Sequence, residues 1–260
     1  MTYQQVIGIM GVGHLIRHMV PGLLRAAVPP KLLLSPRGAE TAGALSRRFG
    51  IEIAKDNHDL VESSQMVLIA VRPFQLAQAM TGLPWRDDHL VVSLVAGISI
   101  DTVQALVPRC RVARAIPVIA GEFGASPTCV FPDVPDVRRL LEPTGPIVPL
   151  AVESDFEAAS IISCYCGWVQ ALMGEVTAWL QTENIDPDVA RHLVAAMTKA
   201  SGTVVLERRD EPLDRLVSEL CLPGSFTGQG LDLLRDRKAF APWREACQAL
   251  LERMHKQRGS

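Results

Sequence analysis

The stretch from Val6 to Arg17, VIGIMGVGHLIR, decides how the first half of this chain folds. Its first five residues form an apolar run that is long enough for one buried strand. Apolar residues then recur at helical spacing from Leu15 onward, which predicts a helix that begins near His14. A strand, a glycine-rich turn and a helix in this order are typical of a dinucleotide-binding fold.

Two glycines give this turn its expected chemistry. Gly11 lets the chain turn tightly, and Gly13 lets the backbone approach a pyrophosphate held by free N–H groups at the helix N-terminus. The third glycine of the usual fingerprint is replaced by Ile16. His14 is either a donor to a phosphate or a solvated loop residue. An ordinary glycine-rich turn without a ligand stays open as the alternative.

Composition narrows the class of protein. The chain has 260 residues, enough for one large or two modest domains. Its net charge of −2, without a block of like charge, argues against nucleic-acid and membrane-surface partners. No apolar stretch reaches the roughly 18 residues of a membrane span. Without a signal peptide or a Cys-x-x-Cys pair, we expect a cytoplasmic protein with reduced thiols and no metal site.

Apolar runs alternate with helical patterns through the first half of the chain. Further strands are predicted at 31–35, 65–71, 90–95, 111–116, 128–131 and 147–150, and further helices at 40–49, 74–80 and 100–107. Continuous apolar strands that alternate with helices indicate a parallel sheet covered on both faces. The ligand of such a sheet lies at the carboxyl ends of its strands.

The sequence becomes entirely helical after Leu150. Ser154 and Glu157 fit a capping box for a long helix that ends near residue 182, and Asp186-Pro187 marks the start of the next helix. Further helices are expected at 212–220, 228–235 and 242–255. The first long helix is apolar almost all round, so it needs cover on every side. This predicts a closely packed or helix-swapped homodimer, or a higher homo-oligomer.

The residues after the second strand bear on the choice of cofactor. Folds that prefer NAD usually carry an acid there, which binds the ribose 2′-hydroxyl. Here Ser35-Pro36-Arg37 follow the strand, and the first acid is Glu40. A hydroxyl and a guanidinium suit a 2′-phosphate, so we expect NADP, with NADPH preferred over NADH. The alternative is that Arg37 is a solvated loop residue.

Several segments, in order along nearly the whole chain, resemble pyrroline-5-carboxylate reductase, the last enzyme of proline synthesis. They are Ile7-Gly8 through Gly13, Ser35-Pro36-Arg37, Asp56-Asn57, Ala70-Val71-Arg72-Pro73, SLVAGISI at 93–100, Arg111 to Pro117, and LPGSFT at 222–227. The resemblance implies an oxidoreductase that transfers a hydride from NADPH to the C=N bond of a small cyclic imine acid, pyrroline-5-carboxylate. It also implies an active site shared across a dimer.

With the resemblance, the expected fold is α/β in two parts. An N-terminal Rossmann-type, doubly wound parallel sheet occupies residues 1–151 and binds the dinucleotide. A smaller all-α domain over residues 152–260 provides dimerisation and substrate binding.

The resemblance also assigns roles to residues at matching positions. The expected cofactor-binding residues are Gly8, Gly11, Gly13, His14, Leu15, Ser35, Arg37, Asn57, Ala70, Val71, Pro73, Ala96 and Gly97. The expected substrate loop comprises Pro223, Gly224, Ser225, Phe226 and Thr227, with the N–H groups of residues 224–226 as a nest for a carboxylate. The expected catalytic residues are Thr227, Ser163 and Glu175. The alternative role for Thr227 is the N-cap of the following helix.

The departures from the family lie where the substrate would bind. Val118 and Ile119 replace an Asn-Thr pair near the nicotinamide. Tyr165 and Trp168 add bulk at the start of the long helix, and Phe226 adds bulk to the substrate loop. Tyr165 is either a proton donor or a core aromatic. Two alternatives therefore stay open: a reductase of a bulkier imine, and a catalytically inactive NADP-binding regulatory protein.

Overall fold

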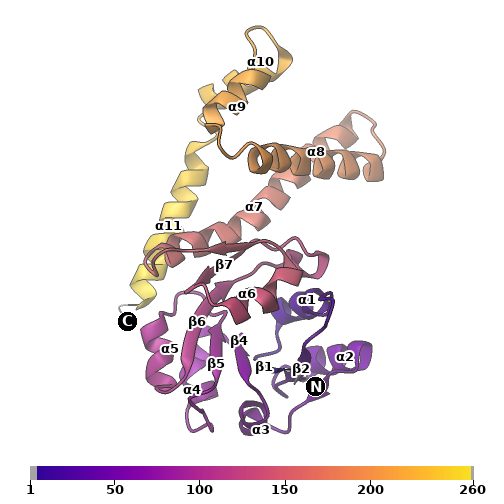
Figure 1. The fold of residues 1–260 in the computed structure, drawn as a ribbon. Helices are drawn as coiled ribbons and strands as arrows, with labels where there is room; N and C mark the ends of the chain where they lie inside the picture. The colour runs from indigo at the N-terminus through magenta and orange to yellow at the C-terminus, as the bar shows by residue number, and fades with distance from the viewer. Residues whose placement is uncertain (1–4, 259–260) are drawn as a thin grey trace. The chain divides into compact units, whose positions relative to one another are not determined.

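The computed structural model describes residues 5–258, so the outer ends of the two predicted domains, 1–4 and 259–260, lie outside the described residues. Strands and helices alternate in the first part of the chain (Figure 1). The strands are β1 (Val6–Met10), β2 (Lys31–Leu34), β3 (Glu52–Ile53), β4 (Met66–Ile69), β5 (Leu90–Ser93), β6 (Arg111–Ile116), β7 (Thr128–Phe131) and β8 (Ile147–Pro149).

Six α-helices and three short 3-10 helices connect these strands. The α-helices are α1 (His14–Leu23), α2 (Ala39–Phe49), α3 (Asn57–Glu62), α4 (Leu76–Met80), α5 (Ile100–Leu106) and α6 (Pro135–Leu141). The 3-10 helices are η1 (Pro73–Gln75), η2 (Ile119–Phe123) and η3 (Glu142–Thr144).

The strands form one sheet in the order β3-β2-β1-β4-β5-β6-β7-β8. Its strands run parallel, as predicted, except that β7 is antiparallel to β6. The prediction of a wholly parallel sheet is therefore wrong at this pair. The connection between β6 and β7 contains η2 but no crossover α-helix, and a chain without a crossover returns in the opposite direction.

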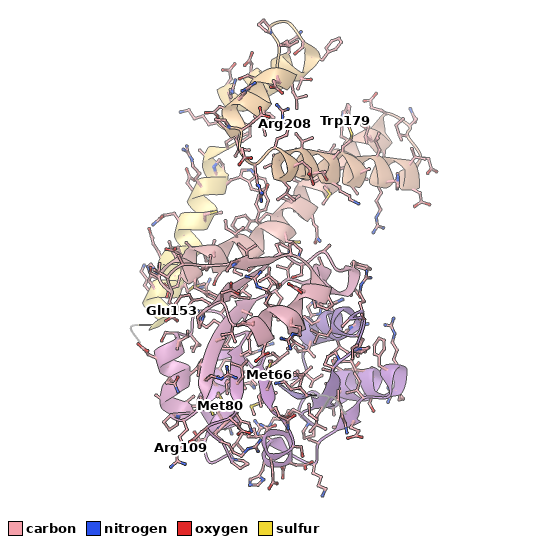
Figure 2. The ribbon with its side chains drawn as sticks, viewed as in Figure 1. Met66, Met80, Arg109, Glu153, Trp179 and Arg208 are labelled. Carbon is pink, nitrogen blue, oxygen red and sulfur yellow. The ribbon has the colours of Figure 1, made fainter. Side chains whose placement is uncertain are left out.

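Two apolar clusters cover the two faces of the sheet, which confirms the doubly wound architecture. In β1, Ile7 and Ile9 point into the cluster that contains buried residues of α1 and α2. Met10 belongs to the opposite cluster, which contains buried residues of α3, α4 and α5. Figure 2 labels one residue of each cluster: Met66 of β4 belongs to the first cluster, and Met80 of α4 belongs to the opposite one.

The chain order reverses at β1, which lies between β2 and β4. Chain connections leave the sheet in opposite directions from such a point, which opens a crevice at the carboxyl ends of the strands. The glycine turn after β1 therefore lies at the position where a doubly wound sheet binds its ligand.

Five helices follow the last strand, as expected. They are α7 (Asp155–Thr182), α8 (Pro187–Glu207), α9 (Leu213–Leu220), α10 (Phe226–Asp236) and α11 (Ala241–Arg258). Asp186 caps α8 by accepting hydrogen bonds from the N–H groups of Asp188 and Val189, and Pro187 is the first helical residue, as predicted. No helix of the described chain is both long and apolar enough to cross a membrane.

The chain divides into two compact units by its contacts. The first unit runs to Ser163 and includes the chain again from Arg253, whereas the second runs from Cys164 to Glu252. The predicted boundary at residues 151–152 marks the change from mixed to helical structure, between β8 and α7. The contacts instead change inside α7, so residues 151–152 stay a prediction as a domain boundary.

An ion pair with a buried arginine fixes the start of α7 within the first unit. Arg114 of β6 is fully buried, and its guanidinium lies 2.7 Å from the carboxylate of Glu153 and 4.1 Å from the ring centre of Phe156. The same carboxylate oxygen of Glu153 accepts the Ile100 N–H at the start of α5, at 2.7 Å. Glu153 therefore connects the segment before α7 to both β6 and α5.

Candidate functional site

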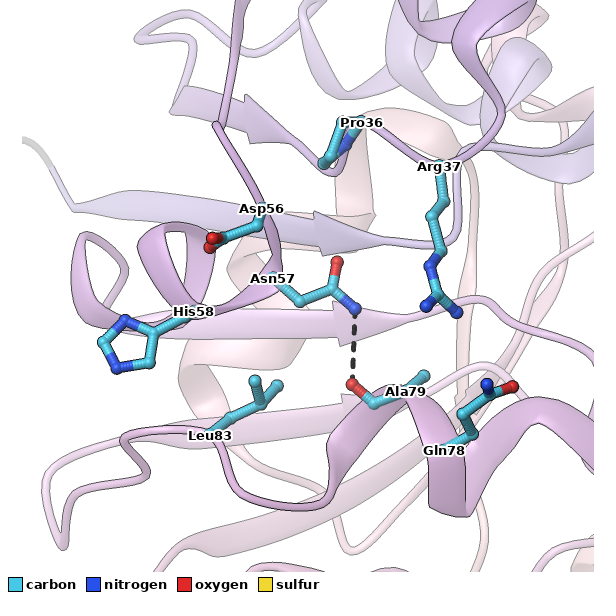
Figure 3. A pocket seen from close by; sticks show the side chains of 8 residues that line it. All are labelled: Pro36, Arg37, Asp56, Asn57, His58, Gln78, Ala79 and Leu83. Atoms are coloured by element: carbon cyan, nitrogen blue, oxygen red, sulfur yellow. Dashed lines mark hydrogen bonds between the residues drawn. The ribbon is translucent and has the colours of Figure 1, made fainter.

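Two adjoining cavities lie at the carboxyl ends of β1, β2 and β4. The first, which we call the turn cavity, has a volume of about 210 Å³. It is lined by Gly11, Val12, Gly13, Arg37, Gly38, Asn57, Ala70, Val71, Arg72, Gln75 and Ala79. The second, the loop cavity, measures about 290 Å³ and is drawn in Figure 3. It shares Arg37, Asn57 and Ala79 with the turn cavity and adds Pro36, Asp56, His58, Gln78 and Leu83.

The glycine turn has the geometry of an anion site. Gly11 has a φ of +92°, and a Cβ there would lie 2.8 Å from the carbonyl carbon and oxygen of Ala70, so a side chain is excluded. A Cβ on Gly13, by contrast, would meet no atom of the described chain within 4 Å. Gly13 begins α1 without a side-chain cap, and the first turn of α1 contains no acid. Its N–H groups therefore face space that an anionic group can occupy.

The loop after β2 is pressed against this turn. Gly38 has a φ of +84°, and a Cβ there would lie 2.3 Å from the carbonyl oxygen of Val12. This close approach brings Arg37 to the boundary between the two cavities, where it lines both. Arg72 lines the turn cavity from the end of β4. Neither arginine forms an ion pair with a described residue, and no acid lines the turn cavity, so this cavity suits a multiply charged anion.

Ser35 has a different place from the one expected. Its side chain is fully buried, and its hydroxyl donates to the Asn57 carbonyl oxygen Oδ1 at 2.8 Å. The backbone of Ser35 still belongs to the sheet ladder, because its N–H donates to the Ile9 carbonyl at 2.9 Å. The hydroxyl therefore points inward, and Ser35 does not line either cavity. Of the two predicted phosphate ligands, only Arg37 lines the cavities, and its role as a ligand stays a prediction.

Asn57 lines both cavities at the start of α3. Its carboxamide Nδ2 donates to the Ala79 carbonyl of α4 at 3.3 Å, the contact drawn in Figure 3. Asp56 precedes it as the N-cap of α3 and accepts the Asp59 N–H at 2.8 Å. Asn57 is therefore held between α3 and α4 with its carboxamide at the edge of the cavities.

Six of the thirteen predicted cofactor residues line the cavities, and the other seven do not. Those that line them are Gly11, Gly13, Arg37, Asn57, Ala70 and Val71. Gly8 instead lies inside β1, where a Cβ would lie 2.5 Å from Ser64 Oγ, so its small size permits close packing of α3. Leu15 packs against the first apolar cluster, and Pro73 is an exposed residue that begins η1.

His14, Ala96 and Gly97 lie elsewhere at the same edge of the sheet. His14 is exposed, and its ring meets that of His18 edge-on at 4.9 Å between centroids. His18 Nδ1 lies 2.8 Å from the carboxylate of Glu122. Ala96 and Gly97 form the turn after β5, where Gly97 has a φ of +75°. A role for these residues with the cofactor stays a prediction.

Sequence reasoning missed the lining residues that come from irregular or short segments. Arg72 carried a usable signal, since it ends an apolar run at the carboxyl end of a predicted strand. Gln75, Gln78 and Ala79 carried none, because η1 and α4 are too short for a helical period to show which side chains face a ligand. Val12, Gly38, Pro36, Asp56, His58 and Leu83 complete the missed set.

The substrate loop differs in detail from its prediction. Helix α10 begins at Phe226, and its N-cap is Ser225, whose hydroxyl accepts the Gly228 N–H at 3.0 Å. Thr227 is thus exposed in the first helical turn, and the alternative that it caps this helix is wrong. The Ser225 N–H donates to the Leu222 carbonyl at 3.0 Å, which removes it from the predicted carboxylate nest.

Ser163 and Glu175, the other predicted catalytic residues, both lie on α7. The Ser163 hydroxyl donates to the Ser160 carbonyl of the preceding turn at 2.7 Å, and Glu175 is exposed. Ser163 is in the first unit, whereas Glu175 and Thr227 are in the helical unit. Their catalytic roles stay predictions.

The bulky residues at the start of α7 form an aromatic cluster with α11. Trp243 meets Tyr165 at 5.8 Å and Trp168 at 6.3 Å between ring centroids, edge-on in both cases. Tyr165 is 48% exposed, so it is not a core aromatic in the single chain. Phe226 is 93% exposed at the start of α10.

Family models match both halves of the chain. A model described as NADP oxidoreductase, coenzyme F420-dependent, matches residues 6–97 and so covers the glycine turn and both cavities. A model described as pyrroline-5-carboxylate reductase dimerisation matches residues 153–257, which comprise all five C-terminal helices apart from the last residue of α11. The second model and the relatives below support a place for this chain in the pyrroline-5-carboxylate reductase family, as a divergent member.

Individual relatives point to the same family. The pyrroline-5-carboxylate reductase 2 of Bacillus subtilis is 24% identical over 245 residues, which cover 89% of this chain and 87% of the relative. The pyrroline carboxylate reductase of Plasmodium falciparum, solved with NADP bound, has a TM-score of 0.84 at 19% identity and covers 96% of this chain and 97% of its own. A reductive aminase from Aspergillus terreus has a TM-score of 0.62 at 15% identity, over 98% and 94% of the two chains.

Proposed function

We propose that this protein is an NADPH-dependent reductase of the C=N bond of a small cyclic imine acid, and that it converts pyrroline-5-carboxylate into proline. The turn cavity is the observation that carries the proposal, since it combines an uncapped helix N-terminus with two arginines and no acid. A dinucleotide with a 2′-phosphate is a multiply charged anion, which suits such a cavity. Family membership supports the reaction, because the named relatives are pyrroline-5-carboxylate reductases.

The residues of the turn cavity fit the parts of NADPH. The N–H groups at the start of α1 would hold the diphosphate, which can come close because the space beside Gly13 is open. Arg37 would bind the 2′-phosphate with a planar, two-pronged donor. Asp56 lines the loop cavity as well, but its carboxylate already accepts the Asp59 N–H and does not replace the acid that NAD-binding folds use.

The substrate would bind at the start of α10. The Phe226 and Thr227 N–H groups occupy the first turn of this helix, where a carboxylate is favoured, and the Thr227 hydroxyl would donate to the substrate. Bound NADPH supplies the hydride that is added to the imine carbon. A cyclic imine is readily protonated on nitrogen, so the reaction does not require a strong acid from the protein. Ser163 and Glu175 are proposed as the other catalytic residues.

A bulkier or more apolar imine is the second candidate substrate. The aromatic cluster of Tyr165, Trp168 and Trp243 favours it, as does the exposed ring of Phe226. Val118 and Ile119 also lack the hydrogen-bonding side chains that the sequence comparison led us to expect there. An aromatic surface binds aryl groups and cations, including an iminium.

The helical unit is proposed to join a homodimer or a higher homo-oligomer. Its family model is a dimerisation model, and several large apolar side chains of α7 and α8 are exposed in the single chain. The cytoplasmic location expected from the sequence stays a prediction.

The deciding experiment is an NADPH-oxidation assay with pyrroline-5-carboxylate and with a bicyclic aryl imine. Turnover of pyrroline-5-carboxylate supports the proposal, and turnover of the aryl imine alone supports the second candidate. Tight NADPH binding without turnover of either imine would instead indicate a regulatory binding protein. Absence of NADPH binding would overturn all three.

A further inference from the structure

We propose that Ser35 is a positioning residue that fixes the carboxamide of Asn57 for the cofactor and does not itself bind the 2′-phosphate. The inference rests on the proposed function, since it concerns how the NADPH site is held in shape. It departs from the expectation drawn from the sequence, in which the Ser35 hydroxyl and Arg37 share the phosphate.

The direction of every hydrogen bond in this network follows from one carbonyl. The Ala79 carbonyl can only accept, so the Asn57 group that lies 3.3 Å from it is the amide nitrogen. The Asn57 oxygen then faces Ser35, whose hydroxyl must donate to it across 2.8 Å. The remaining capacity of the Ser35 oxygen faces the Arg37 N–H at 3.4 Å. The donor of Ser35 is therefore committed to Asn57.

Burial leads to the same role. Ser35 has no exposed surface, and its backbone is hydrogen-bonded into the sheet next to β1. Asn57, by contrast, is half-buried and lines both the turn cavity and the loop cavity. A ligand in these cavities meets the Asn57 carboxamide, and Ser35 decides which way that carboxamide points.

Removal of the Ser35 hydroxyl should weaken the binding of both NADPH and NADH. Ser35→Ala leaves the Asn57 oxygen without its donor and allows the carboxamide to rotate. Asn57 lines the cavities independently of any 2′-phosphate, so the dissociation constants of NADPH and NADH should rise by similar factors. We expect about a three- to tenfold increase for each, the value of one ordinary hydrogen bond.

The test is a fluorescence titration of NADPH and NADH with the full chain. The variants are Ser35→Ala, Asn57→Ala and the double variant, with Ser63→Ala as a matched control because Ser63 is an exposed serine at the end of α3. Ser35→Thr keeps the hydroxyl and should restore affinity. Thermal unfolding of each variant shows that the fold is intact.

Similar losses for both cofactors, with no added loss from Ser35→Ala once Asn57 is alanine, support the positioning role. A loss confined to NADPH and additive with Asn57→Ala would show a direct phosphate ligand and overturn it. Unchanged affinities would also overturn it. Failure of the unsubstituted protein to bind either cofactor would instead overturn the proposed function, and with it the role of Ser35.

Discussion

Arg37 is the residue on which the proposed choice of cofactor depends. It lines both cavities, and the loop that carries it is held against the glycine turn by the close approach of Gly38 to Val12. A guanidinium at this place distinguishes the two dinucleotides only through the 2′-phosphate, because the rest of the cofactor is the same.

Arg37→Gln should therefore weaken the binding of NADPH without weakening the binding of NADH. The loss of a charge-assisted hydrogen-bond pair predicts an increase of about 10- to 100-fold in the NADPH dissociation constant. Titration of both cofactors measures it, and Arg47→Gln on the exposed face of α2 is the control. Equal losses for NADPH and NADH would show that Arg37 does not select the phosphate.

Thr227 and Ser225 separate catalysis from helix capping. Ser225→Ala removes the N-cap of α10 and should lower the free energy of unfolding by about 1 kcal/mol. Thr227→Ala leaves the cap intact, so it should lower kcat about tenfold or more with an unchanged unfolding midpoint. Urea denaturation and the NADPH-oxidation assay measure the two effects. A destabilised Thr227→Ala variant with normal turnover would contradict the catalytic role.

His89 gives the stability of the fold a dependence on pH. The side chain is fully buried, and burial, followed by the nearby charge of Arg86, lowers the pKa of His89 from its usual 6.5. Below about pH 6.5, His89 therefore binds a proton in the unfolded chain but not in the folded chain. The free energy of unfolding should fall as the pH falls from 6.5 toward the folded-state pKa.

Urea denaturation at pH 5.0 and 7.5 tests this prediction. His89→Asn keeps a side-chain acceptor for the Arg86 N–H, which donates to His89 Nδ1 at 3.1 Å, but it cannot titrate. Its loss of stability between the two pH values should be smaller than that of the unsubstituted protein. An equal loss of stability in the His89→Asn variant and the unsubstituted protein would contradict the prediction.

Among the elements, those with a full apolar period were predictable and the shortest were not. Val6–Met10, Arg111–Ile116 and Thr128–Phe131 are strands at the predicted residues. The two-residue β3, the six-residue α3 and the seven-residue α6 were missed, because so few residues show no clear period, although the short α4 was predicted within 74–80. The antiparallel β7 was missed for another reason: strand direction depends on the connection, which residue patterns do not reveal.

The same limit applies to the site. The glycine turn and Arg37 could be predicted because they follow strands whose ends were predicted to within one residue. The inward direction of the Ser35 hydroxyl could not be predicted. It depends on the hydrogen bond from the Ser35 N–H to the Ile9 carbonyl, which continues the sheet pairing one residue beyond the end of β2. The capping of α10 by Ser225 instead of Thr227 turned on a two-residue shift of the helix start.

At the scale of elements, Glu153 should contribute strongly to stability. Glu153→Ala leaves the buried charge of Arg114 without this carboxylate and the Ile100 N–H without its acceptor. We expect the free energy of unfolding to fall by about 3 kcal/mol. Glu52→Ala is the control, because its carboxylate is 66% exposed and 3.5 Å from Lys31, a surface pair worth at most about 1 kcal/mol. Equal effects of the two changes would contradict the prediction.

At the scale of the whole molecule, the helical unit leaves apolar surface uncovered in the single chain. Large apolar side chains are exposed on its long helices, including Leu172, Trp179 and Met197 at 50%, 59% and 65%. Trp179 is labelled in Figure 2, as is Arg208, which joins the end of α8 to α9 through Glu211 and Glu219 at 2.7 Å. Exposed apolar side chains gathered on neighbouring helices are typical of an interface between subunits, which supports the proposed assembly.

Sedimentation equilibrium should therefore give a dimeric or larger mass at micromolar concentration. Met197→Glu places a charge in the proposed interface and should shift the equilibrium toward the monomer while circular dichroism stays the same. Val28→Glu changes an apolar residue of the first unit that is 79% exposed, compared with 65% for Met197, and should not alter the mass. A stable monomer of the unsubstituted protein would contradict the proposed assembly.

The return of the chain to the first unit at Arg253 has a practical consequence for the expression of truncated fragments. Met254 lies beside the Gly97 turn, and His255 lies 2.8 Å from the carboxylate of Glu157. A fragment that stops at residue 163 therefore loses a piece of its own nucleotide half. Stable expression of that half therefore requires that the segment from Arg253 be kept with it.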